Sequence, residues 1–421
     1  MFTKAIPNIE TVHAIRSELN EAFSPGAPVL ERDLFAGRLD QLRLLIDAVE
    51  QRGRHALIFG ERGVGKTSLA NVLNLVVRNP LFKTLYAKLN AEPGENFTSL
   101  WKKIFRRLMT DARVDREIAQ LFANICDQHY GELSIDDIVV TLSAIPARAS
   151  ALIVIDEFDR IQSTGVTAAI ADTLKALSDY SSRATIVLVG VADDVGQLIE
   201  GHRSVARAMV QVKMPRMSQL ELAQIIATRY KRCGMRADEE AMWKMTFLAR
   251  GLPFYAQLIG MHSGRAALDE HRREINAVDV SSALSASVSE LDQSIQDSYM
   301  KAIRSPRNDA LFAHVLLACA LAKGDELGAF QQSAVTQPLN RILPGKNYKP
   351  ATFASHMNEF CNEQRGGVLH RDGESRNYRY RFSDPLMQPF VILKGLATGM
   401  IDDDTAEVYQ NRRQLELSDQ W

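Results

Sequence analysis

The sequence predicts an α/β fold with a doubly wound parallel sheet, followed by a helical domain and a C-terminal winged-helix module. Three observations predict it. A glycine-rich loop stands between an apolar run and a helical pattern within residues 56–77. Two further apolar runs, 151–155 and 185–191, have the β-branched composition of strands buried on both faces. Beyond Pro215 the pattern becomes helical, and a hairpin pattern appears only near residue 368.

The glycine-rich loop at residues 60–67 carries a specific chemical motif. It reads Gly-Glu-Arg-Gly-Val-Gly-Lys-Thr, which matches the phosphate-binding pattern of glycine, four residues, glycine, lysine and then serine or threonine. Glycines let backbone N–H groups turn inward around anionic oxygens, and the following helix adds its positive dipole end. We expect Lys66 to reach the β- and γ-phosphates and the Thr67 hydroxyl to ligate Mg²⁺. The residues expected to bind nucleotide here are Gly60, Glu61, Arg62, Gly63, Val64, Gly65, Lys66, Thr67 and Ser68.

Two adjacent carboxylates follow the buried run 151–155. Asp156 and Glu157 stand at its carboxyl end, where ligands bind in open α/β sheets. Asp156 is predicted to hold the magnesium shell together with Thr67, and Glu157 to act as the base for the attacking water. Strand capping is the alternative interpretation of this pair, but the phosphate loop upstream favours catalysis. The two motifs together predict ATP or ADP and Mg²⁺ as ligands.

Three further residues near these motifs are candidates for the same site. Phe35 and Arg38 lie just upstream of the first core strand, and two interpretations stay open: they line an adenine pocket, or they belong to a helix cap packed on the core. Asp193 follows the buried run 185–191, where a polar side chain senses the γ-phosphate or orients water.

The C-terminal part of the chain predicts a winged helix. Helical patterns near 308–323, 329–342 and 350–363 precede a hairpin pattern over 367–382. Residues 365–381 contain five arginines against two acidic residues. We therefore expect Arg371, Arg376 and Arg379 to contact DNA phosphates. A wing used for domain packing is the alternative.

Composition narrows the remaining possibilities. The chain has 421 residues, 50 basic and 51 acidic, so any contact with nucleic acid must come from a local patch. Its four cysteines have no short paired spacing, which argues against a zinc site and a disulfide framework and is typical of a reducing cytoplasm. No secretory leader is evident, and the apolar runs are too short for a bilayer span. We expect a cytoplasmic protein with no membrane partner.

With these stretches located, the chain resembles the AAA+ ATPases, chiefly their origin-recognition-like branch, and it is also similar to the STAND signalling ATPases. The likeness covers roughly residues 33–292, plus a winged-helix module that often follows in that branch. Gly60–Thr67 matches the Walker A motif. Asp156-Glu157-Phe158-Asp159 matches the Walker B form common in that branch. The resemblance implies a P-loop NTPase core with a helical lid.

The resemblance also implies roles for residues outside the two motifs. Asp193 matches the sensor-1 position, where the family usually has asparagine or threonine. Arg203 matches the region that supplies an arginine finger to a neighbouring subunit, with Arg207 as the second candidate, so a homo-oligomer assembled through the ATP site is implied. The sensor-2 position, where AAA+ proteins usually have an arginine, is occupied here by Gly251-Leu252-Pro253. This turn is similar to the STAND arrangement, in which the proline region contacts the nucleotide, so the resemblance implies such a contact for Pro253. This hybrid implies slow or partner-dependent hydrolysis.

These inferences predict five segments. They are an N-terminal segment and linker (1–32), the AAA+ nucleotide-binding domain (33–216), a helical lid (217–295), a winged-helix domain (296–400) and a C-terminal tail (401–421).

The predicted function is an ATP-binding and ATP-hydrolysing switch that assembles with itself. It couples nucleotide state to double-stranded DNA or to a partner through the winged helix, as the resemblance to replication, transposition and mobile-element or phage-defence ATPases implies. The alternative is a STAND-like signalling or scaffold ATPase whose winged helix binds protein. A small-molecule kinase also has a phosphate loop, but it explains poorly the paired carboxylates and the long C-terminal extension.

Overall fold

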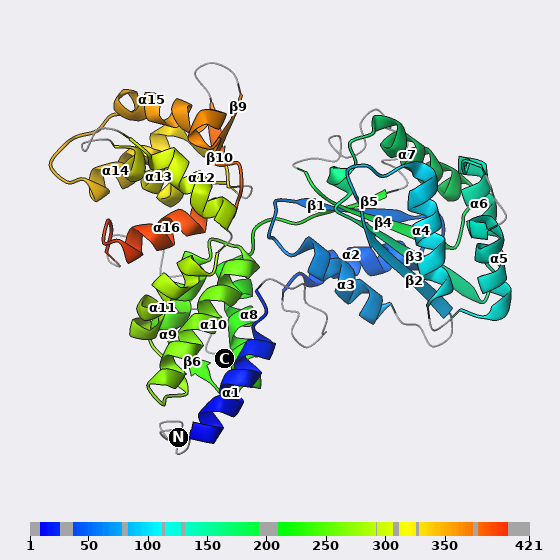
Figure 1. Cartoon of the computed structure of the whole chain (residues 1–421), viewed down its shortest axis with the longest axis horizontal. Helices are drawn as coiled ribbons and strands as arrows, with labels where there is room; N and C mark the ends of the chain where they lie inside the picture. Colours follow the sequence, from blue (N-terminus) through cyan, green and yellow to red (C-terminus); the bar gives the residue numbers. More distant parts are fainter. Residues whose placement is uncertain are drawn as a thin grey trace. The chain divides into compact units, whose positions relative to one another are not determined.

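The computed structural model describes residues 9–25, 37–77, 83–111, 114–127, 131–192, 209–291, 293–305, 311–325, 328–373 and 378–402. These residues form two compact units (Figure 1). One consists of residues 28–61 and 65–214, and the other combines residues 1–27, 62–64 and 215–421. None of the helices described in this structure has the length and apolar character needed to cross a membrane.

The first unit is built on a five-stranded parallel sheet with the order β2-β3-β4-β1-β5. Its strands are β1 (His55–Gly60), β2 (Lys83–Asn90), β3 (Ala149–Asp156), β4 (Ala184–Val191) and β5 (Met209–Lys213). The central strands are apolar along nearly their whole length because helices cover both faces of the sheet. The predicted parallel α/β fold is confirmed. Since all strands run the same way, the glycine loop after β1 and the carboxylates after β3 open onto one edge, with β4 between them.

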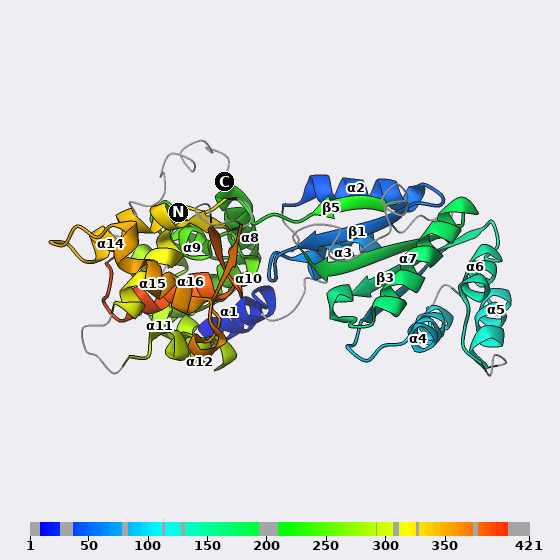
Figure 2. The same cartoon turned by 90° about the horizontal axis from the view of Figure 1, so that it is seen from above.

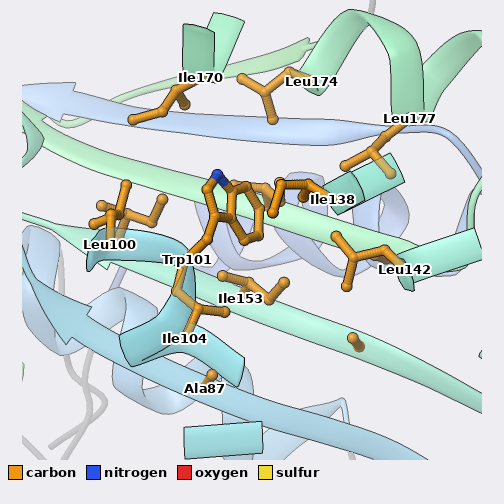
Figure 3. Close-up of a cluster of buried hydrophobic side chains, with 14 of the residues drawn as sticks. Ala87, Leu100, Trp101, Ile104, Ile138, Leu142, Ile153, Ile170, Leu174 and Leu177 are labelled. Atoms are coloured by element: carbon orange, nitrogen blue, oxygen red, sulfur yellow. The ribbon is translucent and has the colours of Figure 1, made fainter. Parts of the chain in front are cut away.

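Six helices cover this sheet. α2 (Leu39–Glu50) and α3 (Lys66–Val76) pack together and contact one face, whereas α4 (Phe97–Met109), α5 (Arg116–Asp127), α6 (Ile135–Ser143) and α7 (Thr164–Asp179) form the hydrophobic core with the other (Figure 2). Trp101 of α4 is fully buried in that core, where Ile138 of α6 and Ile153 of β3 lie around its ring (Figure 3).

The second unit begins with a four-helix domain. Its helices are α8 (Gln219–Arg232), α9 (Glu239–Leu248), α10 (Pro253–Asp269) and α11 (Ala277–Ser289), with a short parallel pair of strands, β6 (Arg236–Ala237) and β7 (Glu274–Ile275). The N-terminal helix α1 (Ile9–Ala22) packs on α8 and α10 of this domain. Phe23 follows α1, is buried, and lies 5.1 Å from the ring of Tyr230 between centroids. The N-terminal helix is therefore part of the helical domain's core.

The chain then forms a C-terminal module of helices and a small sheet. Its elements are α12 (Gln293–Ile303), α13 (Phe312–Leu321), β8 (Phe330–Gln331), α14 (Thr336–Ile342), α15 (Pro350–Phe360), β9 (Leu369–Asp372), β10 (Arg379–Phe382) and α16 (Met387–Ala397). The three strands are antiparallel in the order β8-β10-β9. The predicted order of helices followed by a hairpin is observed, and its assignment as a winged helix stays an interpretation.

One helical prediction in this module is partly wrong. The pattern near 329–342 is helical only from residue 332 onward, because Phe330 and Gln331 form β8. Phe330 pairs with Tyr380 of β10, and the two rings stack with centroids 6.4 Å apart. This pairing between residues 50 positions apart overrides the local helical pattern.

The helical domain and the C-terminal module are joined by buried polar contacts. The Tyr255 hydroxyl of α10 donates to the Leu386 carbonyl at 2.5 Å. Arg216, just after β5, donates to the Gln388 side-chain oxygen, and the Gln388 amide nitrogen donates to the Ala320 carbonyl of α13 at 2.9 Å. The five segments predicted from the sequence stay a prediction, but these contacts explain why the two C-terminal segments form one compact unit.

Candidate nucleotide site

The phosphate loop follows the buried strand β1 and ends where α3 begins. Gly60, the last residue of β1, has φ 149° and packs so closely that a Cβ there would lie 2.4 Å from the Met214 carbonyl oxygen. Gly65 precedes α3 with φ 95°, in the left-handed region that other residues avoid. These two glycines allow the sharp backbone turns that a phosphate-binding loop requires.

Lys66 lies inside this loop. Its side chain is almost fully buried, and its ammonium donates to the Gly60 carbonyl at 2.9 Å and to the Glu61 carbonyl at 2.7 Å. Thr67 and Ser68 follow it in the first turn of α3, each half-buried. The Lys66 ammonium, the hydroxyl residues Thr67 and Ser68 and the N-terminus of α3 therefore lie together near the carboxyl end of β1.

Asp156 ends β3 and is only 3% exposed. One carboxylate oxygen accepts the backbone N–H of Glu157 at 2.9 Å, and the other lies 3.1 Å from the ammonium of Lys88 on β2. The Lys88 ammonium also donates to the Asn71 side-chain oxygen of α3 at 2.8 Å. Burial, reinforced by the negative charge of Asp156, raises the pKa of the nearby Tyr86 phenol to about 12. Asp156 is thus a buried carboxyl group whose immediate neighbours are a lysine ammonium and a backbone N–H.

Glu157 has a different environment. It adopts a left-handed backbone with φ 55° and leads into the 3₁₀ helix η2 (Phe158–Arg160). That conformation costs a residue with a side chain about 1 kcal/mol or more, and such strain clusters at functional sites. The Glu157 side chain is half-exposed and accepts a hydrogen bond from Arg160 at 2.6 Å. The predicted base therefore lies beside the buried Asp156, within reach of solvent.

Asp159 connects the turn after β3 to the neighbouring strand. Its carboxylate accepts the backbone N–H of Val191, the last residue of β4, at 2.8 Å. The predicted sensor Asp193 lies two positions beyond Val191 and outside the described residues. The predicted finger Arg203, its alternative Arg207 and the predicted adenine contact Phe35 also lie outside the described residues.

Two other predicted nucleotide contacts have defined local structure. Arg38 is buried, has a left-handed backbone with φ 60° and immediately precedes α2, as the helix-cap interpretation expects. Pro253 is buried at the first position of α10, where proline is favoured because its missing N–H would have no helical partner. A nucleotide contact by either residue stays a prediction.

The predicted DNA-binding arginines do not gather on one face. Arg371 pairs with Tyr380 across the β9–β10 hairpin, so it shares a face with Tyr380 and Tyr378, and its guanidinium lies 4.3 Å from the Tyr378 ring centroid. Arg379 alternates with these tyrosines, lies on the opposite face and forms a 2.9 Å ion pair with Asp325. Arg376 lies outside the described residues.

The residues around Asp156 are suited to a magnesium ion. Mg²⁺ prefers hard oxygen ligands, keeps several waters and usually binds through one or two carboxylates plus substrate phosphates. The Thr67 hydroxyl and the Asp156 carboxylate are ligands of this kind. Each Asp156 oxygen has one partner and therefore retains a free lone pair. No cluster of three or more acidic, histidine or cysteine side chains suited to a metal occurs among the described residues.

Three side chains at this site escape prediction from sequence. Lys88 contacts Asp156 from the neighbouring strand, Asn71 of α3 accepts a hydrogen bond from Lys88, and Arg160 donates to Glu157. Only Lys88 gives a signal in the sequence, because a lysine interrupts the largely apolar strand β2 between Ala87 and Leu89.

This geometry defines a P-loop NTPase: a parallel sheet, a glycine loop leading into a helix, and an acidic pair at the end of another strand. A family model described as Novel STAND NTPase 1 matches residues 29–249, more than half of the chain. The chain belongs to this family. The match confirms the STAND part of the predicted resemblance, and with the fold it establishes an NTPase of this class.

Solved structures with the same fold share little sequence with this chain. A Walker-type ATPase, Paby2304 of Pyrococcus abyssi, has a TM-score of 0.50 at 16% identity and covers 88% of this chain and 99% of its own. Two origin-recognition proteins of Aeropyrum pernix are less similar. ORC2, solved as ADPNP–ADP complexes, has a TM-score of 0.47 at 16% identity, and the match covers 92% of this chain and 98% of ORC2. ORC1, solved in complex with DNA, has a TM-score of 0.46 at 15% identity, and the match covers 90% of this chain and 95% of ORC1. No curated protein matches the chain.

Proposed function

We propose that this protein is an ATP-dependent molecular switch that binds MgATP at the Gly60–Thr67 loop and hydrolyses it slowly. One observation supports this above the others: the loop and the Asp156–Glu157 pair end two strands of one parallel sheet, β1 and β3, and open onto the same edge. Acidic and cationic groups at such an edge are arranged for phosphoryl chemistry.

Each group has a role in this chemistry. The loop N–H groups and Lys66 bind the phosphates and offset the charge that develops during transfer. Thr67 and Asp156 would hold a magnesium ion, which supplies further compensation of the phosphate charge. The Glu157 carboxylate takes a proton from the attacking water. Asp193 would sense the γ-phosphate, Phe35, Arg38 and Pro253 would complete the nucleotide pocket, and Arg203 would act from a neighbouring subunit.

Glu157 has a built-in reason for slow turnover. Its carboxylate is paired with Arg160 at 2.6 Å, and that ion pair must open before the carboxylate can accept a proton from water. Because the pair is half-exposed, it is weak, and opening costs about 1 kcal/mol or less. Opening at that cost slows turnover by about fivefold at most, so a stronger dependence on assembly rests on the predicted finger Arg203 and not on this pair.

We propose that the C-terminal module passes nucleotide state to a protein partner. The separation of Arg371 and Arg379 onto opposite faces of the hairpin, each with a partner inside the module, favours protein over DNA. Duplex DNA is the second candidate, because the side chains of both arginines remain exposed. In that case binding weakens steeply with salt.

The test is ATP turnover of the wild type, Glu157→Gln and Arg203→Ala, each with and without duplex DNA. We expect magnesium-dependent turnover in the wild type and a loss of about 10²-fold or more in Glu157→Gln, with ATP binding retained. Arg203→Ala loses activity if the finger acts between subunits. Stimulation by DNA would support the DNA-linked switch, whereas tight ATP binding with no DNA effect would support the protein-linked one. Wild-type turnover equal to that of Glu157→Gln under every condition contradicts hydrolysis at this site.

A further inference from the structure

Lys88 lies beside the predicted magnesium ligand because of strand register. In the parallel pairing of β2 with β3, Lys88 is opposite Val154 and Asn90 is opposite Asp156. Lys88 and Asp156 are therefore diagonal neighbours on the same face of the sheet, a separation that a long side chain spans easily. The neighbours Ala87 and Leu89 belong to the hydrophobic core on the opposite face.

Both ends of this contact are held in place. The Lys88 ammonium lies 3.1 Å from Asp156 and 2.8 Å from Asn71, which projects from α3, the helix that follows the phosphate loop. The side chains are 19% exposed for Lys88 and 4% for Asp156, so this is not a solvent-screened surface pair. Among the described residues, Lys88 is the cationic side chain that forms an ion pair with Asp156.

A buried carboxylate needs a compensating positive charge. Leaving one partner of a buried ion pair without the other is strongly destabilising. Lys88 meets this need when no metal is present. The same charge repels a divalent cation brought to Asp156, and at these distances in a poorly hydrated site the repulsion is substantial.

We propose that Lys88 is a positioning residue that acts as the resident counter-ion of Asp156 and weakens Mg²⁺ binding at the nucleotide site. The inference rests on the proposed function, because it concerns the same site. Lys88 stabilises the metal-free state, so nucleotide binding depends less on Mg²⁺ than it would with a bare carboxylate. This dependence is an equilibrium property and is measured without turnover.

The test compares the affinity of a fluorescent ADP in excess Mg²⁺ with its affinity in EDTA, using the full-length chain. The variant is Lys88→Gln, which removes the charge and keeps an amide that can donate to Asp156. We expect the ratio of the two affinities to rise roughly fivefold or more over the wild type, because Mg²⁺ no longer meets a competing charge. Lys83→Gln is the matched control, since it removes an exposed lysine from the same strand and should leave the ratio unchanged.

Asn71→Ala separates charge from packing. It removes one anchor of the ammonium while both charges remain, so its ratio should stay near that of the wild type. An unchanged or lowered ratio in Lys88→Gln, or an equal rise in Asn71→Ala, overturns the proposal. If the wild type binds no nucleotide in either condition, the proposed function fails and this inference fails with it.

A folding defect in Lys88→Gln is also informative. Adding Asp156→Asn then removes the buried negative charge as well. Recovery of the melting temperature in the double variant shows that the missing counter-ion caused the defect. A double variant as unstable as Lys88→Gln contradicts a counter-ion role.

Discussion

In the nucleotide-binding unit, the burial of a side chain and its neighbours determine what chemistry that side chain can perform. Asp156 and Glu157 are adjacent, yet one is buried against a lysine and the other is half-exposed on a left-handed turn. The first can orient a cation, and the second can exchange protons with water. The different roles proposed for the two carboxylates thus agree with their different burial.

His55 shows the same principle away from the site. It is fully buried at the start of β1, where Ile186 donates its backbone N–H to Nδ1 at 3.1 Å and Nε2 lies 3.1 Å from the Leu174 carbonyl. Since Nδ1 accepts, Nε2 carries the proton and the ring is neutral. Burial, opposed in part by the bond to Leu174, lowers the pKa of His55 from its ordinary 6.5 to about 4.

This shift predicts a loss of stability in mild acid. The unfolded chain binds the His55 proton more tightly than the folded chain does. The contribution of neutral His55 to the free energy of unfolding is therefore complete above pH 6.5 and is lost as the pH falls toward 4. The loss is about 2 kcal/mol at pH 5 and about 3 kcal/mol at pH 4. Calorimetric unfolding between pH 7.5 and pH 5 should show a shallower pH dependence for His55→Gln than for the wild type. His271→Asn, at an exposed histidine, should keep the wild-type slope, and an unchanged slope in His55→Gln would refute the prediction.

Among the elements, α1 and α10 fit together through a glycine. At Gly260 of α10, a Cβ would lie 2.7 Å from Cε1 of Phe23, the residue that follows α1. The Phe23 ring cannot move away easily, because it is buried against Tyr230. The glycine is therefore a contact surface for the N-terminal segment, despite its poor helix propensity.

We predict that Gly260→Ala destabilises the helical domain by up to about 2 kcal/mol. Helix propensity alone would favour alanine by about 1 kcal/mol, but overpacking a filled core costs about 1–3 kcal/mol. Faster hydrogen exchange in α1 should accompany the loss. Gly165→Ala in α7 is the control, because only Ser163 lies within 4 Å of its added Cβ and no destabilisation is expected. Stabilisation by Gly260→Ala would show that α1 does not pack as described.

Sequence patterns predict elements well where local signals and burial agree. The helical spacing of Trp101, Ile104, Phe105 and Leu108 predicts a helix over 97–109. The structure has α4 with these bounds, and Asn96 caps its start. By contrast, α16 gives no periodicity to read, because it is apolar on nearly all sides and contains Pro389. β8 is two residues long and exists through its pairing with β10.

The candidate site divides in the same way. Gly60–Thr67 and Asp156–Glu157 are contiguous motifs, so the sequence contains them whole. Lys88 meets Asp156 only through the register of β2 on β3, and Asn71 meets Lys88 only through the packing of α3. Both depend on contacts between residues far apart in the chain. The placement of Arg371 and Arg379 on opposite faces also depends on distant contacts, because the pairing of β9 with β10 determines which face of the hairpin each side chain occupies.

At the scale of the whole molecule, the described residues form two compact units. One contains most of the candidate nucleotide site. The other includes residues 62–64 of the phosphate loop and joins the helical domain to the C-terminal module through Arg216, Gln388 and Tyr255. These contacts place the helical domain and the module in one compact unit.

The central claim is that the Gly60–Thr67 loop binds a nucleoside triphosphate, and equilibrium binding of labelled ATP tests it most directly. We predict that the wild type binds ATP with magnesium present and that Lys66→Ala loses at least about tenfold in affinity, because the buried ammonium no longer meets the phosphates. Lys83→Ala, on the exposed end of β2, should bind like the wild type. Equal affinity of the wild type and Lys66→Ala, or no binding by either, would contradict the claim.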